Sequence, residues 1–397
     1  MTAHGLVHWF ETAIPILLVV WLVEFDVTVA IVGAVVAIGY APFGLGALPA
    51  GILADRYGPR RLVLVCVGGM SLSFLVVAAA NSIWTVGIGL VLWGVAASMY
   101  HPAGLSLIST GVQRRGTVFA WHGIAGNLGI ALGPLTTAIL LIWFDWSLVA
   151  AVLALPGIVA VAWGTRASFD TYAATSVDQT TSDTVTVESF LTDSRALFAS
   201  SFAVVFVIVT FEGLFYRGML TYLPEVMHDL PALAGITTGG GLEGIEPTDF
   251  IYVGLLVVGM LGQYLGGKAT ERIPAGIGLT SIFFILAVLA IAFIPVIEIG
   301  LGALLIWAVL VGLFLFGIQP FYQEAVAVYT PPEGRGLSYG YTYLGEFGLG
   351  AASVAIGGYV LGAYTIAAFF LMLAIFAVIG GTLSTLLLRI GVHENDS

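Results

Sequence analysis

GILADRYGPRR, residues 51–61, is a short charged segment between two long apolar runs, residues 28–52 and 62–80. Its charged and turn-forming residues are Gly51, Asp55, Arg56, Gly58, Pro59, Arg60 and Arg61. Arginines and a proline directly after a run long enough to cross hydrocarbon predict a loop where the chain leaves a membrane. The fold therefore depends on whether such runs recur along the chain.

The composition is that of a membrane protein. Of 397 residues, 59% are hydrophobic and only 9% are charged, and the mean hydropathy is +1.05. Soluble globular domains carry about 25% charged residues. Only helices and closed barrels satisfy the backbone in lipid. Because the apolar runs are long and continuous, without two-residue alternation, they predict an all-α polytopic fold.

Several function classes are disfavoured by the same composition. The net charge is −11 and no basic patch occurs, so we expect no nucleic-acid partner. The acidic excess is compatible with a high-salt environment. The single cysteine, Cys66, lies in an apolar run and is expected to be a buried hydrophobe. The first apolar run has no basic segment before it, so we expect it to stay as a span rather than be removed as a signal.

Twelve spans follow from runs of about 20 apolar residues. They are predicted at residues 5–23, 29–52, 62–80, 84–110, 117–142, 147–164, 198–222, 250–270, 275–295, 300–326, 337–361 and 364–388. The tenth and eleventh are long, and we expect them to tilt or bend.

The basic residues agree with this map. All 12 lysines and arginines except Arg217 fall on one side of the predicted spans. The positive-inside rule makes that side cytoplasmic, with both termini on it, in a cell membrane. The chain is then divided into a six-helix bundle, residues 1–164, a Thr-, Ser- and Asp-rich linker, residues 165–197, and a second six-helix bundle, residues 198–397.

The two halves carry matching motifs. His101-Pro102 followed by Arg115-Gly116 in the first half corresponds to Gln319-Pro320 followed by Arg335-Gly336 in the second. The 51–56 segment has a weaker counterpart at 266–272. A six-plus-six repeat is typical of transporters that bind substrate between their halves near mid-membrane.

Over essentially its whole length the sequence resembles the major facilitator superfamily. The family's loop Gly-x-Leu-Ala-Asp-Arg-x-Gly-x-Arg-Arg is present as Gly51, Leu53, Ala54, Asp55, Arg56, Gly58, Arg60 and Arg61. The resemblance implies that this loop is a conformational gate that latches the outward-facing state. Pro59 departs from the family pattern, in which a basic residue is common at that position.

A second motif lies in the fifth span, where Gly129, Gly133 and Pro134 resemble the Gly-x-x-x-Gly-Pro motif of drug/proton antiporters. Glycines four apart allow two helices to approach closely, and proline kinks a helix. The antiporter pattern continues with Gly-Gly, whereas this chain has Thr137-Ala138, and Leu90 stands where those exporters often carry an arginine. The segments 100–104, 115–116 and 126–129, with His4, His8 and Pro15, resemble the fosmidomycin-resistance-type efflux branch.

Ionisable residues inside spans are costly and are functional candidates by default. We expect proton coupling or a substrate cavity to use Glu346, Glu324, Glu11, His8, His101, His122, Asn127, Gln319, Glu212 and Arg217. All lie on spans that the resemblance places at or beside the cavity. Purely structural roles remain open for some of them. His8 and Glu11 would form a pair at the membrane interface, and the side chain of Arg217 would reach the outer interface. Glu324 would pair with Arg335.

The sequence thus favours a proton-coupled secondary exporter of a small organic molecule, working by alternating access. A carboxylate in a low-dielectric cavity binds protons readily, and Glu346 and Glu324 are the first candidates. The alternative is an uptake symporter for an organic anion held by Arg217. An enzyme is disfavoured because the sequence has no nucleophile elbow, phosphate loop or metal-ligand motif. We expect no cofactor and no metal, and partners limited to the lipid bilayer, the substrate and protons or another coupling ion, in a monomer.

Overall fold

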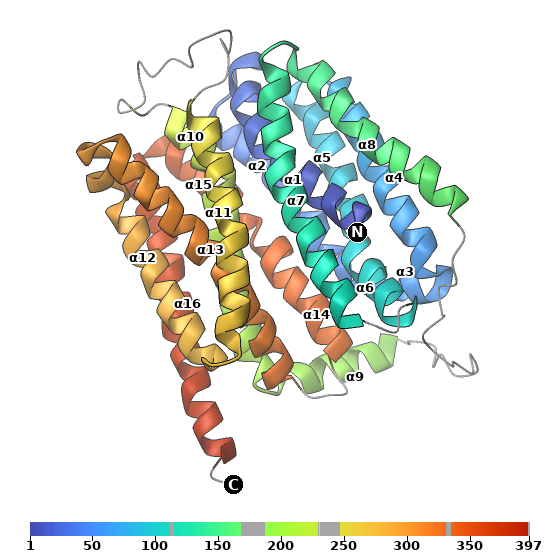
Figure 1. Ribbon diagram of the computed structural model, residues 1–397, viewed down its shortest axis with the longest axis vertical. Helices are drawn as coiled ribbons and strands as arrows, with labels where there is room; N and C mark the ends of the chain where they lie inside the picture. The colour runs from blue at the N-terminus through green and yellow to red at the C-terminus, as the bar shows by residue number, and fades with distance from the viewer. Residues whose placement is uncertain (112–114, 168–186, 229, 231–246, 331–334, 396–397) are drawn as a thin grey trace.

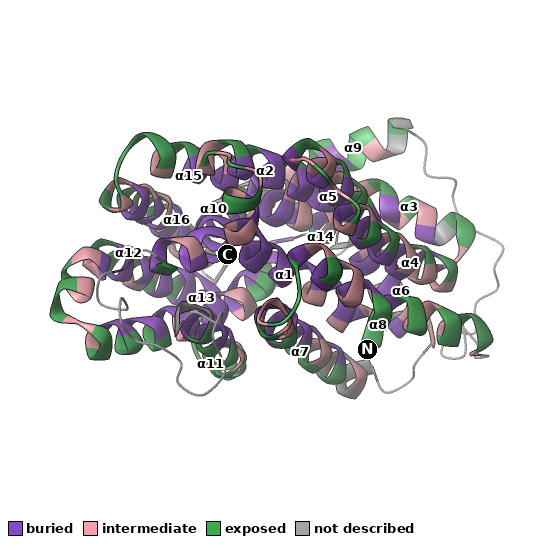
Figure 2. Cartoon of the chain, turned by 90° about the horizontal axis from the view of Figure 1, so that it is seen from above, coloured by how far each residue is buried: buried purple, intermediate pink, exposed green. Residues whose placement is uncertain are grey.

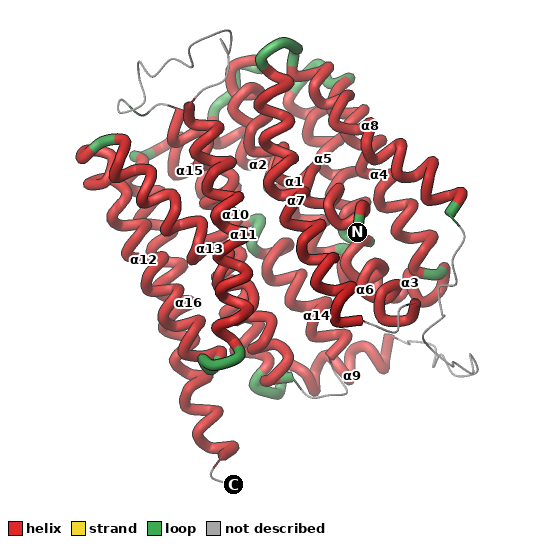
Figure 3. Tube along the Cα trace, in the orientation of Figure 1, coloured by secondary structure: helices red, strands yellow, loops and turns green. Residues whose placement is uncertain are grey.

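The computed structural model describes residues 1–111, 115–167, 187–228, 230, 247–330 and 335–395. Within these ranges the chain is helical apart from short turns, and no strand occurs (Figure 3). Eleven helices are long and apolar enough to cross a membrane, or 12 if a bent pair counts as one span. The predicted all-α polytopic fold is confirmed.

The first half of the chain forms one group of helices (Figure 1). They are α1 Thr2–Glu24, α2 Val29–Leu45, α3 Ala47–Tyr57, α4 Pro59–Ala78, α5 Ile83–Ala97, α6 Tyr100–Gly111, α7 Arg115–Leu141 and α8 Trp146–Arg166. α9, Val187–Phe198, forms the last part of the predicted linker and lies at the end of the molecule near α14.

The second half forms the other group of helices. They are α10 Phe202–His228, α11 Pro247–Thr270, α12 Ala275–Ile299, α13 Leu301–Tyr329, α14 Arg335–Tyr343, the π-helix Leu344–Leu349, α15 Ala352–Ala363 and α16 Ile366–Asn395. Seen from above, exposed residues gather on the periphery and buried residues line the interior (Figure 2). An apolar periphery is what a helix bundle presents to lipid.

Three spans are interrupted. The second bends by 40° between α2 and α3 at Gly46. Pro49 follows three residues later and has no N–H to donate to the carbonyl oxygen of Leu45, so the helical hydrogen bonds are interrupted there. The fourth breaks between α5 and α6, just before His101, and the eleventh contains the π-helix. The eleventh span was expected to bend, but the break in the second was not. The seventh span, α10, ends at His228, six residues after the predicted end at residue 222.

Glycines set how closely the helices pack, and they do so in both halves. A Cβ on Gly94 would lie 2.2 Å from the carbonyl oxygen of Gly39, in spans four and two. A Cβ on Gly266 would lie 2.4 Å from the carbonyl oxygen of Gly317, in spans eight and ten. Real Cβ contacts are never this short, so both pairs pack backbone against backbone. The packing therefore repeats between the halves as the motifs do.

The two halves are sealed at one end. We call the side with the turns 57–59 and 271–274 the arginine-rich side, and the other the opposite side. Near the opposite side, a Cβ on Gly33 of α2 would lie 2.0 Å from the hydroxyl of Tyr222, 2.9 Å from the carbonyl oxygen of Val354 and 3.1 Å from the Cα of Gly358. The Tyr222 hydroxyl donates to the Val354 carbonyl at 2.5 Å. No side chain larger than hydrogen fits at Gly33, so this seam between the halves is closed.

Candidate functional site

A cavity of about 600 Å³ lies between the two halves. It is large enough for a small organic molecule. Its walls come from α1, α6 and α7 on one side and α10, α11, α13, α14 and the π-helix on the other. The polar residues that line it are His4, His8, Glu11, Ser106, His101, His122, Asn127, Tyr216, Gln263, Gln319, Tyr322, Gln323, Tyr339, Thr342, Tyr343 and Glu346.

The lining residues lie towards the arginine-rich ends of their helices. Ser106 is five residues before the end of α6, Gln323 six before the end of α13, and Tyr339 four after the start of α14. The two acidic lining residues, Glu11 and Glu346, lie nine and eleven residues from the starts of their spans at Thr2 and Arg335. The cavity thus extends from the middle of the helices towards the arginine-rich side, while the seam at Gly33 closes the opposite side.

A buried ion pair joins the halves beside the cavity. Arg217 of α10 contacts Glu11 of α1 through Nη1 and Oε1, and the two side chains are 4% and 5% exposed. The guanidinium lies over the Phe347 ring at 4.4 Å and the Tyr40 ring at 4.9 Å. Cation–π contacts of a desolvated arginine contribute about 2 kcal/mol each. The interpretation of Arg217 as an outer-interface side chain is therefore wrong, because its charge is neutralised inside the protein.

Glu11 is also held by its own half. Its Oε2 accepts from Nδ1 of His8 at 2.6 Å, one turn earlier on the same face of α1. The pair is not interfacial, as one reading of the sequence had it, because Glu11 is buried. The reason is packing: a Cβ on Gly129 would lie 1.9 Å from the carbonyl oxygen of Gly5. The first turns of α1 therefore lie against the middle of α7, far from its start at Arg115.

Glu346 lies within the π-helix. It is 3% exposed, and its Oε2 accepts from the hydroxyl of Tyr322 at 2.7 Å. The π-helix packs its backbone on α10, since a Cβ on Gly213 would lie 2.4 Å from the carbonyl oxygen of Glu346. Insertions of this kind occur frequently at functional sites. The sequence indicated the carboxylate but not the irregular turn that presents it.

Glu212 is buried behind Glu346, outside the cavity lining. It is 2% exposed, and neither carboxylate oxygen has a hydrogen-bond partner within the described part of the chain. Its main charged neighbours are Glu346 and Arg217. Burying a carboxyl group without a hydrogen-bond partner costs folding free energy. Three acidic residues, Glu11, Glu212 and Glu346, therefore lie near one arginine, Arg217, and only Glu11 is paired with it.

Four histidines cluster on the first half. His4 and His8 of α1 have their Nε2 atoms 3.2 Å apart. His101 packs its ring centroid 5.4 Å from that of His4 and 4.6 Å from that of Tyr343 in the other half. The ring of His122 stacks on His4 at 3.7 Å. Spacing alone could not show that four histidines from three helices meet.

The structure brings most of the predicted candidates together. Seven of the ten line the cavity: Glu346, Glu11, His8, His101, His122, Asn127 and Gln319. Gln319 accepts from Nε2 of Gln263 at 3.3 Å. Arg217 and Glu212 lie behind the wall, and Glu324 is exposed and outside the lining. Glu324 is therefore not placed where it could serve the cavity.

Sequence reasoning missed His4, Gln263, Tyr216 and Tyr322 as lining residues. His4 could have been found, because it precedes His8 by one helical turn and so shares its face. Gln263 lies in the eighth span, and its polarity was a usable signal. The tyrosines carried none, because tyrosine is common in helices of every environment.

The 51–61 segment is compact. α3 ends at Tyr57, Gly58 adopts φ +85°, and Pro59 starts α4. Nη2 of Arg60 donates to the carbonyl oxygens of Gly164 at 3.1 Å and Ala167 at 2.5 Å. An arginine at these last carbonyls of α8 is favoured by the helix dipole. The loop thus ties spans three and six of one half together.

The remaining motif residues have separate environments. Arg56 lies over the ring of Tyr57 at 5.4 Å, Arg61 is exposed, and a Cβ on Gly51 would meet nothing within 4 Å. The side chain of Asp55 lies outside the described residues. In α7, Gly133 faces the carbonyl oxygen of Trp9, 2.3 Å from where a Cβ would lie. Pro134 follows it inside the helix.

Comparison with known proteins shows the relationship of this chain to transporters. The family described as Major Facilitator Superfamily matches residues 1–353. The chain is 28% identical over 124 residues, 31% of its length, to an uncharacterized MFS-type transporter YqjV of Bacillus subtilis (strain 168). It is 29% identical over 109 residues, 26% of its length, to a Na(+), Li(+), K(+)/H(+) antiporter of Planococcus maritimus. These alignments span 30% and 26% of the two relatives.

A solved structure shares the fold over nearly its full length. It is a bacterial homolog of the human lysosomal transporter Spinster, in an inward-facing and occupied conformation. The TM-score is 0.74 at 14% identity, and the alignment covers 98% of this chain and 95% of that one. The arrangement of helices is therefore common to both.

Proposed function

The chain belongs to the major facilitator superfamily, and we propose that it is a secondary active transporter that carries a small organic molecule by alternating access. The observation that carries this proposal is the cavity of about 600 Å³ between the halves, whose lining residues lie towards the arginine-rich ends of their helices. On the opposite side, Gly33 seals the seam against Tyr222 and Val354. A route open to one side at a time is what a transporter requires and a channel does not.

We further propose that the arginine-rich side is cytoplasmic, as the positive-inside rule implies. Both termini then lie on that side of a cell membrane, and the structure is an inward-facing state. The Spinster homolog of the same fold is described as inward-facing, which supports this reading.

Proton coupling is supported by the charges at the seam. Glu11, Glu212 and Glu346 surround the single arginine, Arg217, in a region shielded from water. Surplus negative charge in low dielectric is costly and is relieved when a carboxylate binds a proton. Glu346 is the proposed proton carrier because it lines the cavity and its carboxylate accepts a hydrogen bond from the neutral hydroxyl of Tyr322.

We propose export in exchange for protons as the direction. One relative is an antiporter that exchanges monovalent cations for protons, and Gly129, Gly133 and Pro134 resemble the motif of drug/proton antiporters. We also propose that the chain belongs to the fosmidomycin-resistance-type efflux branch, which segments 100–104, 115–116 and 126–129 resemble. The rival hypothesis of anion uptake through Arg217 loses support, because that arginine is paired with Glu11 and lies outside the cavity lining.

The test begins with a thermal-stabilisation screen of purified protein against small organic compounds, since a ligand of the folded state raises the melting temperature. A stabilising compound is then assayed in proteoliposomes with and without an imposed pH gradient. We expect Glu346→Gln to keep substrate exchange but lose its acceleration by the gradient. Glu324→Gln, the same change on an exposed glutamate outside the cavity, should behave as wild type. Wild-type response to the gradient in Glu346→Gln would refute the assignment.

A further inference from the structure

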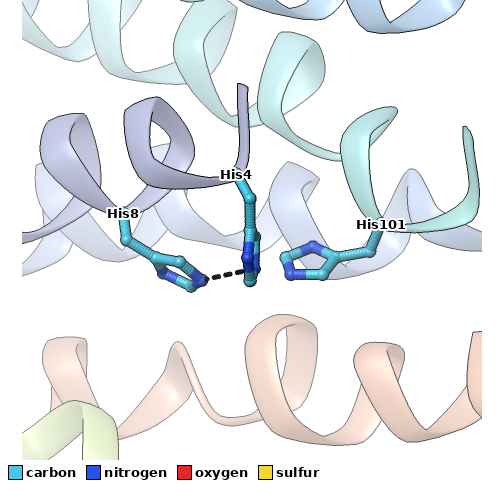
Figure 4. A group of neighbouring side chains, drawn as sticks. All are labelled: His4, His8 and His101. Carbon is cyan, nitrogen blue, oxygen red and sulfur yellow. Dashed lines mark hydrogen bonds between the residues drawn. The ribbon is translucent and has the colours of Figure 1, made fainter. Parts of the chain in front are cut away.

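Three imidazoles converge on one point of the cavity wall. His4 and His8 come from successive turns of α1, and His101 comes from the start of α6 (Figure 4). One ring nitrogen of each lies within 4.8 Å of those of the other two. In Figure 4 the ring of His4 stands between those of His8 and His101.

Hydrogen bonds orient the rings of His4 and His8 through their Nδ1 atoms. Nδ1 of His4 lies 2.7 Å from the carbonyl oxygen of His122, which can only accept. Nδ1 of His8 lies 2.6 Å from Oε2 of Glu11, whose other oxygen contacts Arg217. Each ring therefore turns its second nitrogen, Nε2, towards the other ring.

The two Nε2 atoms face one another at a distance of 3.2 Å. Two nitrogens bound at about 2.0–2.1 Å to one tetrahedral zinc ion are about 3.3 Å apart. The His4–His8 pair is therefore already spaced for coordination, and His101 supplies a third nitrogen after a small side-chain movement.

We propose that His4, His8 and His101 bind a divalent transition-metal ion of the zinc, cobalt or nickel type on the cavity wall. Imidazole nitrogen suits these ions, whereas magnesium and calcium prefer oxygen. Glu11 and the carbonyl of His122 are then the outer partners that orient the ligands, the usual arrangement around metal-bound histidines. Three protein ligands leave the fourth tetrahedral position to water or to a donor atom of a molecule in the cavity. The sequence, which indicated no metal, could not show the contribution of His101.

Cobalt absorption tests this directly, with protein purified by an affinity tag that contains no histidine. Co²⁺ in a tetrahedral nitrogen site gives visible d–d bands, and we expect them to saturate at one ion per chain and to be displaced by Zn²⁺ but not by Mg²⁺. His8→Gln and His101→Asn should each weaken Co²⁺ binding by about 100-fold or more, since even outer-partner losses cost 10–100-fold. His228→Gln, which removes an exposed histidine outside the cluster, should bind as wild type.

Two results would overturn the proposal. One is folded wild-type protein with no Co²⁺ bands at millimolar Co²⁺, in which case a shared proton bridges His4 and His8. The other is equal loss of binding in His228→Gln and His8→Gln, which would indicate adventitious surface binding. If a variant does not fold, the wild-type stoichiometry and the Zn²⁺ displacement still decide. Neither result bears on transport, so this proposal and the proposed function can fail separately.

Discussion

Gly33→Leu should open the seam on the opposite side of the membrane. Even the Cβ of alanine would lie 2.9 Å from the Val354 carbonyl oxygen and 2.0 Å from the Tyr222 hydroxyl. Leucine extends two carbon–carbon bonds beyond that Cβ, about 2.5 Å further. Overpacking costs about 1–3 kcal/mol, which exceeds the 0.5–1 kcal/mol of helix stability gained by replacing glycine. Separation of the halves relieves the cost, and each 1.4 kcal/mol shifts the population about tenfold.

The separation is measurable by electron–electron double resonance. Spin labels at Asn81→Cys and Tyr364→Cys, in a Cys66→Ala background, report the distance between the halves at the opposite side. Both positions are exposed, and Cys66 is the only native cysteine. We expect Gly33→Leu to move the main distance population outwards by at least several ångströms.

Gly262→Leu is the matched control. Its Cβ would lie 2.2 Å from the Leu313 carbonyl oxygen, an equally severe contact that lies within the second half. It should lower stability without changing the distance between labels. A folded Gly33→Leu protein with the wild-type distance distribution would refute the reasoning, as would equal displacement in both variants.

Three further predictions concern stability, each measured by unfolding in detergent. Glu11→Gln and Arg217→Met should each cost about 3–5 kcal/mol because each leaves a buried charge unpaired, whereas the double variant should cost less than their sum; strictly additive costs would argue against the pair. Gly58→Ala should cost about 1–3 kcal/mol through its φ of +85° alone, since a Cβ there meets nothing within 4 Å; an unchanged melting temperature would contradict this. Tyr322→Phe should cost about 1.5–3 kcal/mol if its hydroxyl donates to a charged Glu346; a loss below about 0.5 kcal/mol would count against that contact.

The helices were predictable because hydrocarbon imposes one solution on apolar runs of this length. Breaks inside the spans were harder to predict from the sequence. Pro49 marked the bend of the second span only after the fact, since prolines such as Pro15, Pro42 and Pro156 lie within continuous helices. The π-helix at Glu346 has no sequence marker of its own, because it depends on Gly213 of another helix accepting its backbone.

The candidate site was predictable as a set of residues but not as a set of contacts. The cost of a charge in a span singled out Glu11, Glu346 and Arg217 without indicating partners. For Arg217 the outer interface stayed open as an alternative, because its partner Glu11 lies 206 positions away, in the other half. Glu324 was named as a first candidate because it lies in a span, but its side chain is exposed and lies outside the cavity lining. Long-range pairing is set by how the halves meet, which one sequence does not state.

Thiol labelling from each side of the membrane tests alternating access most directly. Asn127→Cys on the cavity wall, in a Cys66→Ala background, is treated in oriented proteoliposomes with a membrane-impermeant maleimide. We predict labelling from the arginine-rich side in the otherwise wild-type chain, and from the opposite side once Gly33→Leu is added. Labelling from both sides at equal rates, or from one side unchanged by Gly33→Leu, would contradict the account.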